Sequence, residues 1–170
     1  ILLVSVVLLS APGDRLNRLF TGFLVALGTW GITIFLMRDA FPDATSAYTI
    51  EKIALAVIPF TSIFFYHFVY AFAGVKRNRS VLRGFYGLGI VAAVLSLLGI
   101  TADGMIVKFY GFAPAITSAF ILVLLASYPP VALAIWDIRK TLKNSHSRRA
   151  NQLRLLRLGA IVSLLGATSD

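Results

Sequence analysis

The sequence predicts an all-α fold, namely a polytopic bundle of membrane helices. Of its 170 residues, 58% are apolar and only 14% are charged, and the mean hydropathy is +0.85. In a soluble domain roughly a quarter of the residues are charged, whereas a membrane span consists of about 20 predominantly apolar residues. The composition therefore indicates an integral membrane protein, and it leaves too few polar residues for a separate catalytic domain.

Apolar runs mark six predicted helices, of which the first and the last are too short for a full span. The runs rarely alternate between apolar and polar residues, so helices are favoured over barrel strands. We expect residues 1–170 to be a single domain and a fragment of a longer protein, since the chain does not begin with Met. The six runs are Ile1–Ala11, Leu19–Met37, Ile53–Gly74, Leu82–Thr101, Ala115–Trp136 and Leu155–Ser169.

Basic residues are distributed unevenly between the loops. Those after the first, third and fifth runs hold 13 Lys and Arg, and the other loops hold 3. Because the cytoplasmic side carries the excess of Lys and Arg, the sequence predicts that the N-terminus lies outside. The cytoplasmic basic surface is expected to contact anionic lipid headgroups and not nucleic acid. Its main residues are Lys76, Arg77, Arg79, Arg139, Lys140, Arg148 and Arg149.

The sequence contains no pattern that carries enzyme chemistry. It has no Cys, no HExxH and no cluster of His with carboxylates, so neither a metal nor a cofactor is expected. The close glycines of Gly84–Gly89 lie at the start of an apolar run and follow no strand. They favour close helix packing over a dinucleotide site. We therefore expect that this chain is not itself an enzyme.

Aromatic side chains surround a histidine within the run Ile53–Gly74. Tyr66 and Tyr70 flank His67, and an imidazole inside a span needs a polar partner. One interpretation is a hydrogen bond to a neighbouring helix within an aromatic core. The other is a site for a small hydrophobic or aromatic ligand, to which Trp30 and Tyr128 are weaker candidate contributors.

Prolines predict hinges in two of the helices. Pro59 is expected to kink the run Ile53–Gly74, and Pro129 with Pro130 to break or kink the run Ala115–Trp136, because proline cannot donate the helical hydrogen bond. The basic segment Asp137–Arg157 follows directly. A tilt at these prolines would displace that segment at the membrane surface.

Several short segments resemble one known family. They are the basic and Asn-containing Arg15–Phe20, Pro59 followed by the HF-x-x-x-F pattern of Tyr66–Phe72, Tyr110-Gly111, the basic Arg148–Arg154, and the closing Asp170. In these positions the chain resembles the seven-transmembrane N-terminal sensor region of bacterial histidine kinases. The same region also precedes diguanylate cyclase and other signalling domains.

The resemblance implies a sensory input domain in the bacterial cytoplasmic (inner) membrane. Its seventh helix, and a cytoplasmic output domain such as a kinase or a cyclase, would follow Asp170, and that part would form a homodimer. Two alternatives stay open, namely a structural or accessory subunit that binds other subunits of a larger membrane complex, and a small transporter or membrane-embedded enzyme. The coding sequence after Asp170 distinguishes these three hypotheses.

Overall fold

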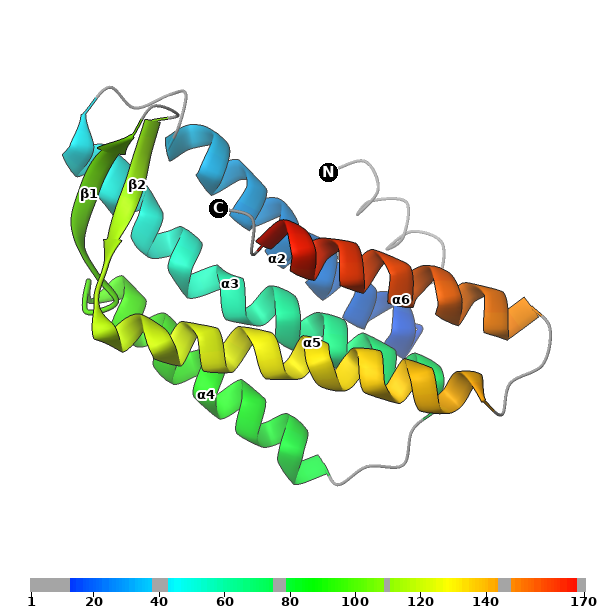
Figure 1. The fold of residues 1–170 in the computed structure, drawn as a ribbon. Helices are drawn as coiled ribbons and strands as arrows, with labels where there is room; N and C mark the ends of the chain where they lie inside the picture. The colour runs from blue at the N-terminus through cyan, green and yellow to red at the C-terminus, as the bar shows by residue number, and fades with distance from the viewer. Residues whose placement is uncertain (1–12, 38–42, 75–78, 109–110, 144–147, 168–170) are drawn as a thin grey trace.

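The computed structural model describes residues 13–37, 43–74, 79–108, 111–143 and 148–167 (Figure 1). Within these ranges the chain is mostly helical, as predicted. It contains α2 (Arg15–Phe35), α3 (Ala44–Ala73), α4 (Arg79–Leu97), α5 (Ile121–Leu142) and α6 (Arg148–Ala167), together with a short 3-10 helix (Ser118–Phe120) and two strands, β1 (Ala102–Lys108) and β2 (Gly111–Ile116). The predicted first helix, Ile1–Ala11, lies outside the described residues.

Four helices of the described part are long and apolar enough to cross a membrane. They are α2, α3, α4 and the continuous helical segment Ser118–Leu142, which includes α5. This agrees with a multi-pass membrane protein. Successive helices run in opposite directions along the bundle, so α2, α4 and α6 begin near the end at which α3 and α5 finish (Figure 1).

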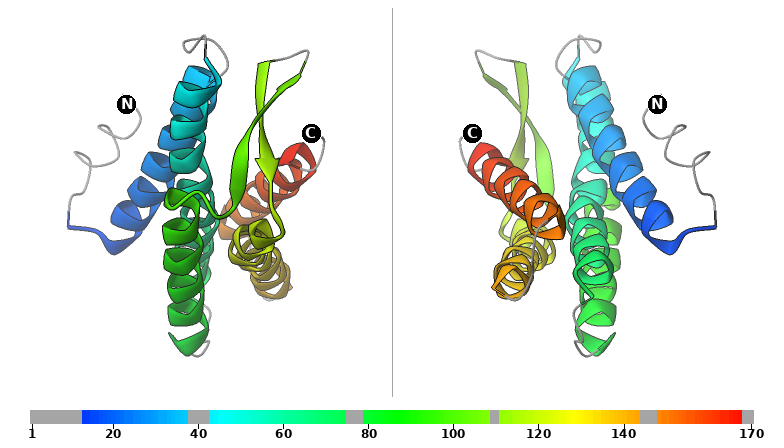
Figure 2. Two further views of the ribbon diagram at one scale, coloured as in Figure 1. Left: turned by 90° about the vertical axis from the view of Figure 1, so that its left-hand side faces the viewer. Right: turned by 90° about the vertical axis from the view of Figure 1, so that its right-hand side faces the viewer.

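Helix α3 is the centre of the bundle. It contacts α2, α4, α5 and both strands, and α6 packs against α5. Viewed along the bundle, α2 lies on one side of α3, while α5 and α6 lie on the other (Figure 2). The helix begins nine residues before the predicted run because the Asp43 side chain accepts a hydrogen bond from the Ser46 N–H at 2.8 Å and caps it. Its 30 residues span about 45 Å, which exceeds the roughly 30 Å of a hydrocarbon core.

A two-stranded hairpin departs from the all-helical prediction. Strands β1 and β2 are antiparallel, with Lys108 paired to Gly111. The start of the predicted run Ala115–Trp136 was therefore wrong, since its first residues belong to β2. The segment is rich in β-branched and aromatic residues, and Gly111 has a φ of 114°, which favours glycine.

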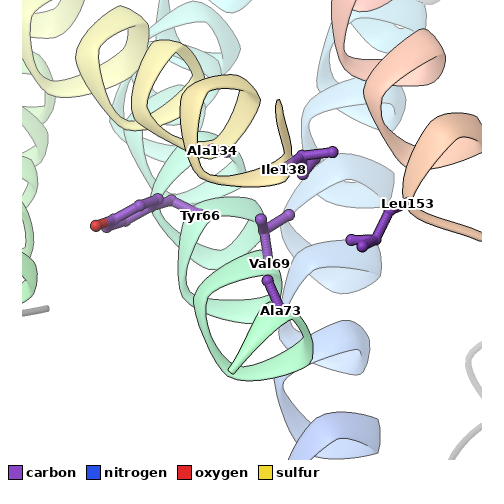
Figure 3. Close-up of a cluster of buried hydrophobic side chains, with 6 residues drawn as sticks. All are labelled: Tyr66, Val69, Ala73, Ala134, Ile138 and Leu153. Atoms are coloured by element: carbon purple, nitrogen blue, oxygen red, sulfur yellow. The ribbon is translucent and has the colours of Figure 1, made fainter. Parts of the chain in front are cut away.

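A hydrophobic cluster joins three helices near the end of α3. Tyr66, Val69 and Ala73 of α3 are buried with Ala134 and Ile138 of α5 and Leu153 of α6 (Figure 3). Tyr66 is only 1% exposed. It therefore contributes to the packing that holds α5 and α6 on α3.

The prolines do not interrupt their helices. Helix α3 continues through Pro59 and α5 through Pro129 and Pro130, so the predicted break in α5 is wrong. Since proline has no N–H, the carbonyl groups of Leu125 and Ala126, one turn earlier, lack their helical donors. A hinge at this place stays a prediction. Within the basic segment Asp137–Arg157, residues 144–147 lie outside the described residues, between the end of α5 and the start of α6.

Candidate functional site

A half-open cavity of about 840 Å³ lies between α2, α3, α5 and α6. This volume falls within the usual range for small-molecule sites. Aromatic rings from three helices and the residue before α5 line much of it, namely Phe23, Trp30, Phe65, Phe120 and Tyr128. Leu155, Leu156, Gly159 and Ala160 add the wall of α6. The cavity is thus an apolar space formed by residues far apart in the sequence.

Four hydroxyl groups belong to the cavity lining. Thr61 Oγ1 donates to the Ile58 carbonyl at 2.6 Å, and Ser127 Oγ donates to the Val123 carbonyl at 2.7 Å. Their hydrogens are therefore occupied, although their lone pairs can still accept. Within the described ranges, the hydroxyls of Ser62 and Tyr128 have no hydrogen-bond partner. Their hydroxyl hydrogens are therefore not committed to an acceptor in this part of the chain.

The five predicted ligand residues do not form one site. Trp30 and Tyr128, the weaker candidates, line the cavity. Tyr66 belongs to the hydrophobic cluster, and its ring centroid lies 6.4 Å from that of Tyr70. His67 faces α2 and α4 instead. Tyr66, His67 and Tyr70 are close together in the sequence of α3, and we therefore predicted that they share one site. Only the tertiary packing shows which helix each side chain faces.

His67 connects three helices through polar contacts. Its Nε2 lies 3.3 Å from Arg15 Nη2 of α2, and its Nδ1 lies 3.0 Å from Tyr86 Oη of α4. Because a guanidinium can only donate, Nε2 must accept, and Nδ1 carries the hydrogen that is donated to Tyr86. The contact between Arg15 and His67 fixes the tautomer. Sequence reasoning missed Arg15 and Tyr86 as partners, since no spacing links positions 52 and 19 residues away.

Two carboxylates are also buried in the helices. Glu51 of α3 is 4% exposed and Asp137 of α5 is 1% exposed. Glu51 Oε2 has no hydrogen-bond partner in the part of the chain that the structure describes. Sequence reasoning assigned neither of them a role. The signal was present for Glu51, because Ala47, Ala54 and Leu55 place it on an apolar helix face.

The predicted basic surface is described only in part. Arg79, Arg139 and Lys140 are exposed near the ends of α4 and α5. Lys76 and Arg77 lie outside the described residues, and Arg148 and Arg149 form the first turn of α6.

In the described ranges, no three His, Cys, Asp or Glu residues lie close enough together to hold a metal ion.

No protein-family model, no curated protein and no solved structure matches this chain. The resemblance to seven-transmembrane sensor regions therefore stays a hypothesis that depends on the quoted segments alone.

Proposed function

We propose that this chain is the membrane-embedded sensory input domain of a bacterial signal-transduction protein. In this proposal it supplies six of seven helices in the inner membrane, with its N-terminus outside. A cytoplasmic output domain, with kinase or cyclase activity and a homodimer interface, follows the seventh helix. The resemblance of the quoted segments and the excess of basic residues in alternate loops support this arrangement.

The observation that carries the proposal is the course of α5. Its first half contributes Val123, Ser127 and Tyr128 to the cavity, and its last turn carries the exposed Arg139 and Lys140. One helix thus connects a candidate ligand site to the side that is predicted to be cytoplasmic. A ligand can shift this helix only if it binds two arrangements of the bundle with different affinities.

The proline pair lies between the cavity and the basic end. Pro129 and Pro130 directly follow Tyr128, and they leave two carbonyl groups of the preceding turn without helical donors. Bending at this point costs fewer hydrogen bonds than bending elsewhere in α5. We propose that ligand occupancy tilts the inner half of α5 and, with it, the neighbouring α6.

The accessory-subunit hypothesis has one observation in its favour. Helix α4 exposes a row of apolar side chains, with Ile90, Val94 and Leu97 each about half exposed. Such a face fits a neighbouring membrane subunit as well as lipid. The two hypotheses predict different coding sequences after residue 170.

The test uses the intact protein in inverted membrane vesicles. A signalling domain encoded after residue 170 is expected, and its kinase or cyclase rate is the measured output. Replacing both Pro129 and Pro130 by Ala should lock that output in one state. The control is Pro114→Ala, which changes a proline of β2 and should leave the stimulus response intact. An intact gene without a signalling domain, or a normal response in the double variant, contradicts the proposal.

A further inference from the structure

The cavity has a chemical character that restricts what it can bind. Five of its lining residues are aromatic, and they come from α2, α3 and the segment Phe120–Tyr128. Aromatic rings favour edge-to-face and offset contacts with other rings. A flexible saturated chain gains no such contacts, so the lining favours a ring system over a lipid tail.

The donors in the cavity add a second restriction. The Ser62 hydroxyl on α3 and the Tyr128 hydroxyl on α5 have no partner within the described ranges. The indole Nε1 of Trp30, a third lining residue, also has no partner there, but this atom is buried and is therefore not open to a ligand in the cavity. A donor left unpaired in an apolar space is costly, and an acceptor on a ligand removes that cost. A carbonyl oxygen, with two lone pairs, can accept from both hydroxyls.

The position of the cavity indicates how a ligand reaches it. The lining residues of α2, α3 and α5 belong to helices that are long and apolar enough to span the membrane. A ligand that is itself soluble in the bilayer therefore has direct access to it.

We infer that the cavity binds a membrane-soluble aromatic ketone, with its rings against the aromatic side chains and its carbonyl oxygen accepting from Ser62 and Tyr128. This inference deepens the proposed sensory function, because it names the class of the ligand. That the ligand is the stimulus rests on the proposed function. The binding itself can be tested separately.

Benzophenone is both a member of this class and a photolabel. On illumination its carbonyl oxygen takes a hydrogen from a nearby C–H, and the two carbon radicals combine, so the adduct carries the full mass of the probe. The intact protein in phosphatidylcholine nanodiscs is labelled and digested, and the labelled residues are mapped by mass spectrometry. Labelling is expected in α3 and α5 at the cavity.

A matched pair of competitors tests the carbonyl. Benzyl phenyl ketone and bibenzyl differ only in a C=O in place of a CH2. The ketone should suppress labelling at a concentration at least about 10-fold lower, as expected for a hydrogen bond that hydrocarbon cannot replace. In the double variant Ser62→Ala, Tyr128→Phe, which keeps the volume of the cavity nearly unchanged, this ratio should fall to about one.

A matched pair of glycine variants tests the location. A Cβ added at Gly159, on the cavity wall, or at Gly28, outside it, would meet no atom within 4 Å. Gly159→Leu should therefore fill the cavity and abolish the specific labelling, whereas Gly28→Leu should not. Circular dichroism of both variants checks that their helices are intact.

Three results would overturn the inference. The first is labelling spread over lipid-facing residues and equally affected by both glycine variants. The second is a ketone preference that persists in the Ser62→Ala, Tyr128→Phe variant. The third uses a phospholipid that carries a benzophenone on its acyl chain. If this lipid labels the cavity and the free ketone does not suppress that labelling, the occupant is a lipid tail.

The failure of this inference can be distinguished from the failure of the proposed function. Ketone binding without any change in output would contradict the sensory function alone. A stimulus response without ketone binding would contradict only this inference.

Discussion

At the scale of single residues, His67 is the best-defined polar contact within the helices. The donor from Arg15 fixes the tautomer in which Nδ1–H points at Tyr86 Oη, and the three side chains come from three different helices. Neither bond lies within one helix. Both therefore depend on how α2 and α4 sit against α3.

Removing the Tyr86 hydroxyl should weaken the bundle. The Tyr86→Phe variant leaves the Nδ1–H of half-buried His67 without its acceptor, which is expected to cost about 1–3 kcal/mol. Thermal unfolding in detergent measures the change. Tyr128→Phe is the control, since its hydroxyl has no partner within the described ranges, and it should unfold close to the wild type. Equal stability of both variants would contradict the bond.

The cap of α3 gives a prediction on pH. The hydrogen bond from the Ser46 N–H lowers the pKa of the Asp43 carboxyl below its ordinary value. The folded pKa lies below the unfolded one, so the stabilisation is complete above the ordinary carboxyl pKa. It is lost as the pH falls through the lowered folded value. Asp43→Asn keeps a capping oxygen without titrating, so the acid-induced decrease in Tm that is due to this residue should be absent from that variant.

At the scale of elements, the contact between α3 and α4 depends on the absence of a side chain. A Cβ on Gly89 would lie 2.6 Å from Cδ1 of the fully buried Ile63, whereas one on Gly87 would meet nothing within 4 Å. Since this methyl group is the end of a flexible but fully buried side chain, the Gly89→Ala variant should force Ile63 to repack and lose about 1 kcal/mol. The Gly87→Ala variant should gain about 0.5–1 kcal/mol from helix propensity. Unfolding of the two variants side by side tests the contact, and a stabilised Gly89→Ala would contradict it.

Hydropathy predicted the helices but not all of their bounds. The runs from Leu19 and Leu82 lie largely within α2 and α4, because burial in lipid leaves an unbroken apolar stretch. The beginning of α3 was missed because Ala44–Lys52 mixes polar and apolar residues and is held by a cap. The hairpin was missed because its two strands are stabilised by pairing with each other and by contact with α3.

The candidate site was less predictable than the helices. Trp30 and Tyr128 were identified as aromatic residues within spans, and both line the cavity. Ser62, Phe23 and Gly159 carry no local signal, because a cavity is formed by the faces of four helices and not by a motif. His67 was singled out from its residue type, but its partners depend on tertiary packing.

At the scale of the whole molecule, the bundle has two chemically different ends. The hairpin lies at the end where α3 begins, and the basic residues of α4 and α5 lie at the opposite end (Figure 1). The orientation itself, with the hairpin outside and the basic end cytoplasmic, stays a prediction from the distribution of basic residues.

Single cysteines in this Cys-free chain test the orientation directly. Ser80 near the start of α4 and Asp103 in β1 are both exposed. A membrane-impermeant maleimide should label Asp103→Cys in intact cells, and it should label Ser80→Cys only after the membrane is permeabilised. The opposite pattern would reverse the topology.

The hairpin fastens one end of the bundle. Tyr48 Oη of α3 donates to the Ala102 carbonyl at 2.5 Å, and Thr117 Oγ1 donates to the Ile100 carbonyl at 2.6 Å. These bonds join the end of α3 at which the hairpin lies to the segments after α4 and before α5. The other half of α5 is also held, because Ala134 and Ile138 are buried against α3 and α6. From Pro130 to Leu142 this half measures about 20 Å, so a tilt of about 10° at the prolines would carry its tip through about 3 Å. Such a displacement is comparable to the spacing of neighbouring side chains, so it requires the buried cluster to repack.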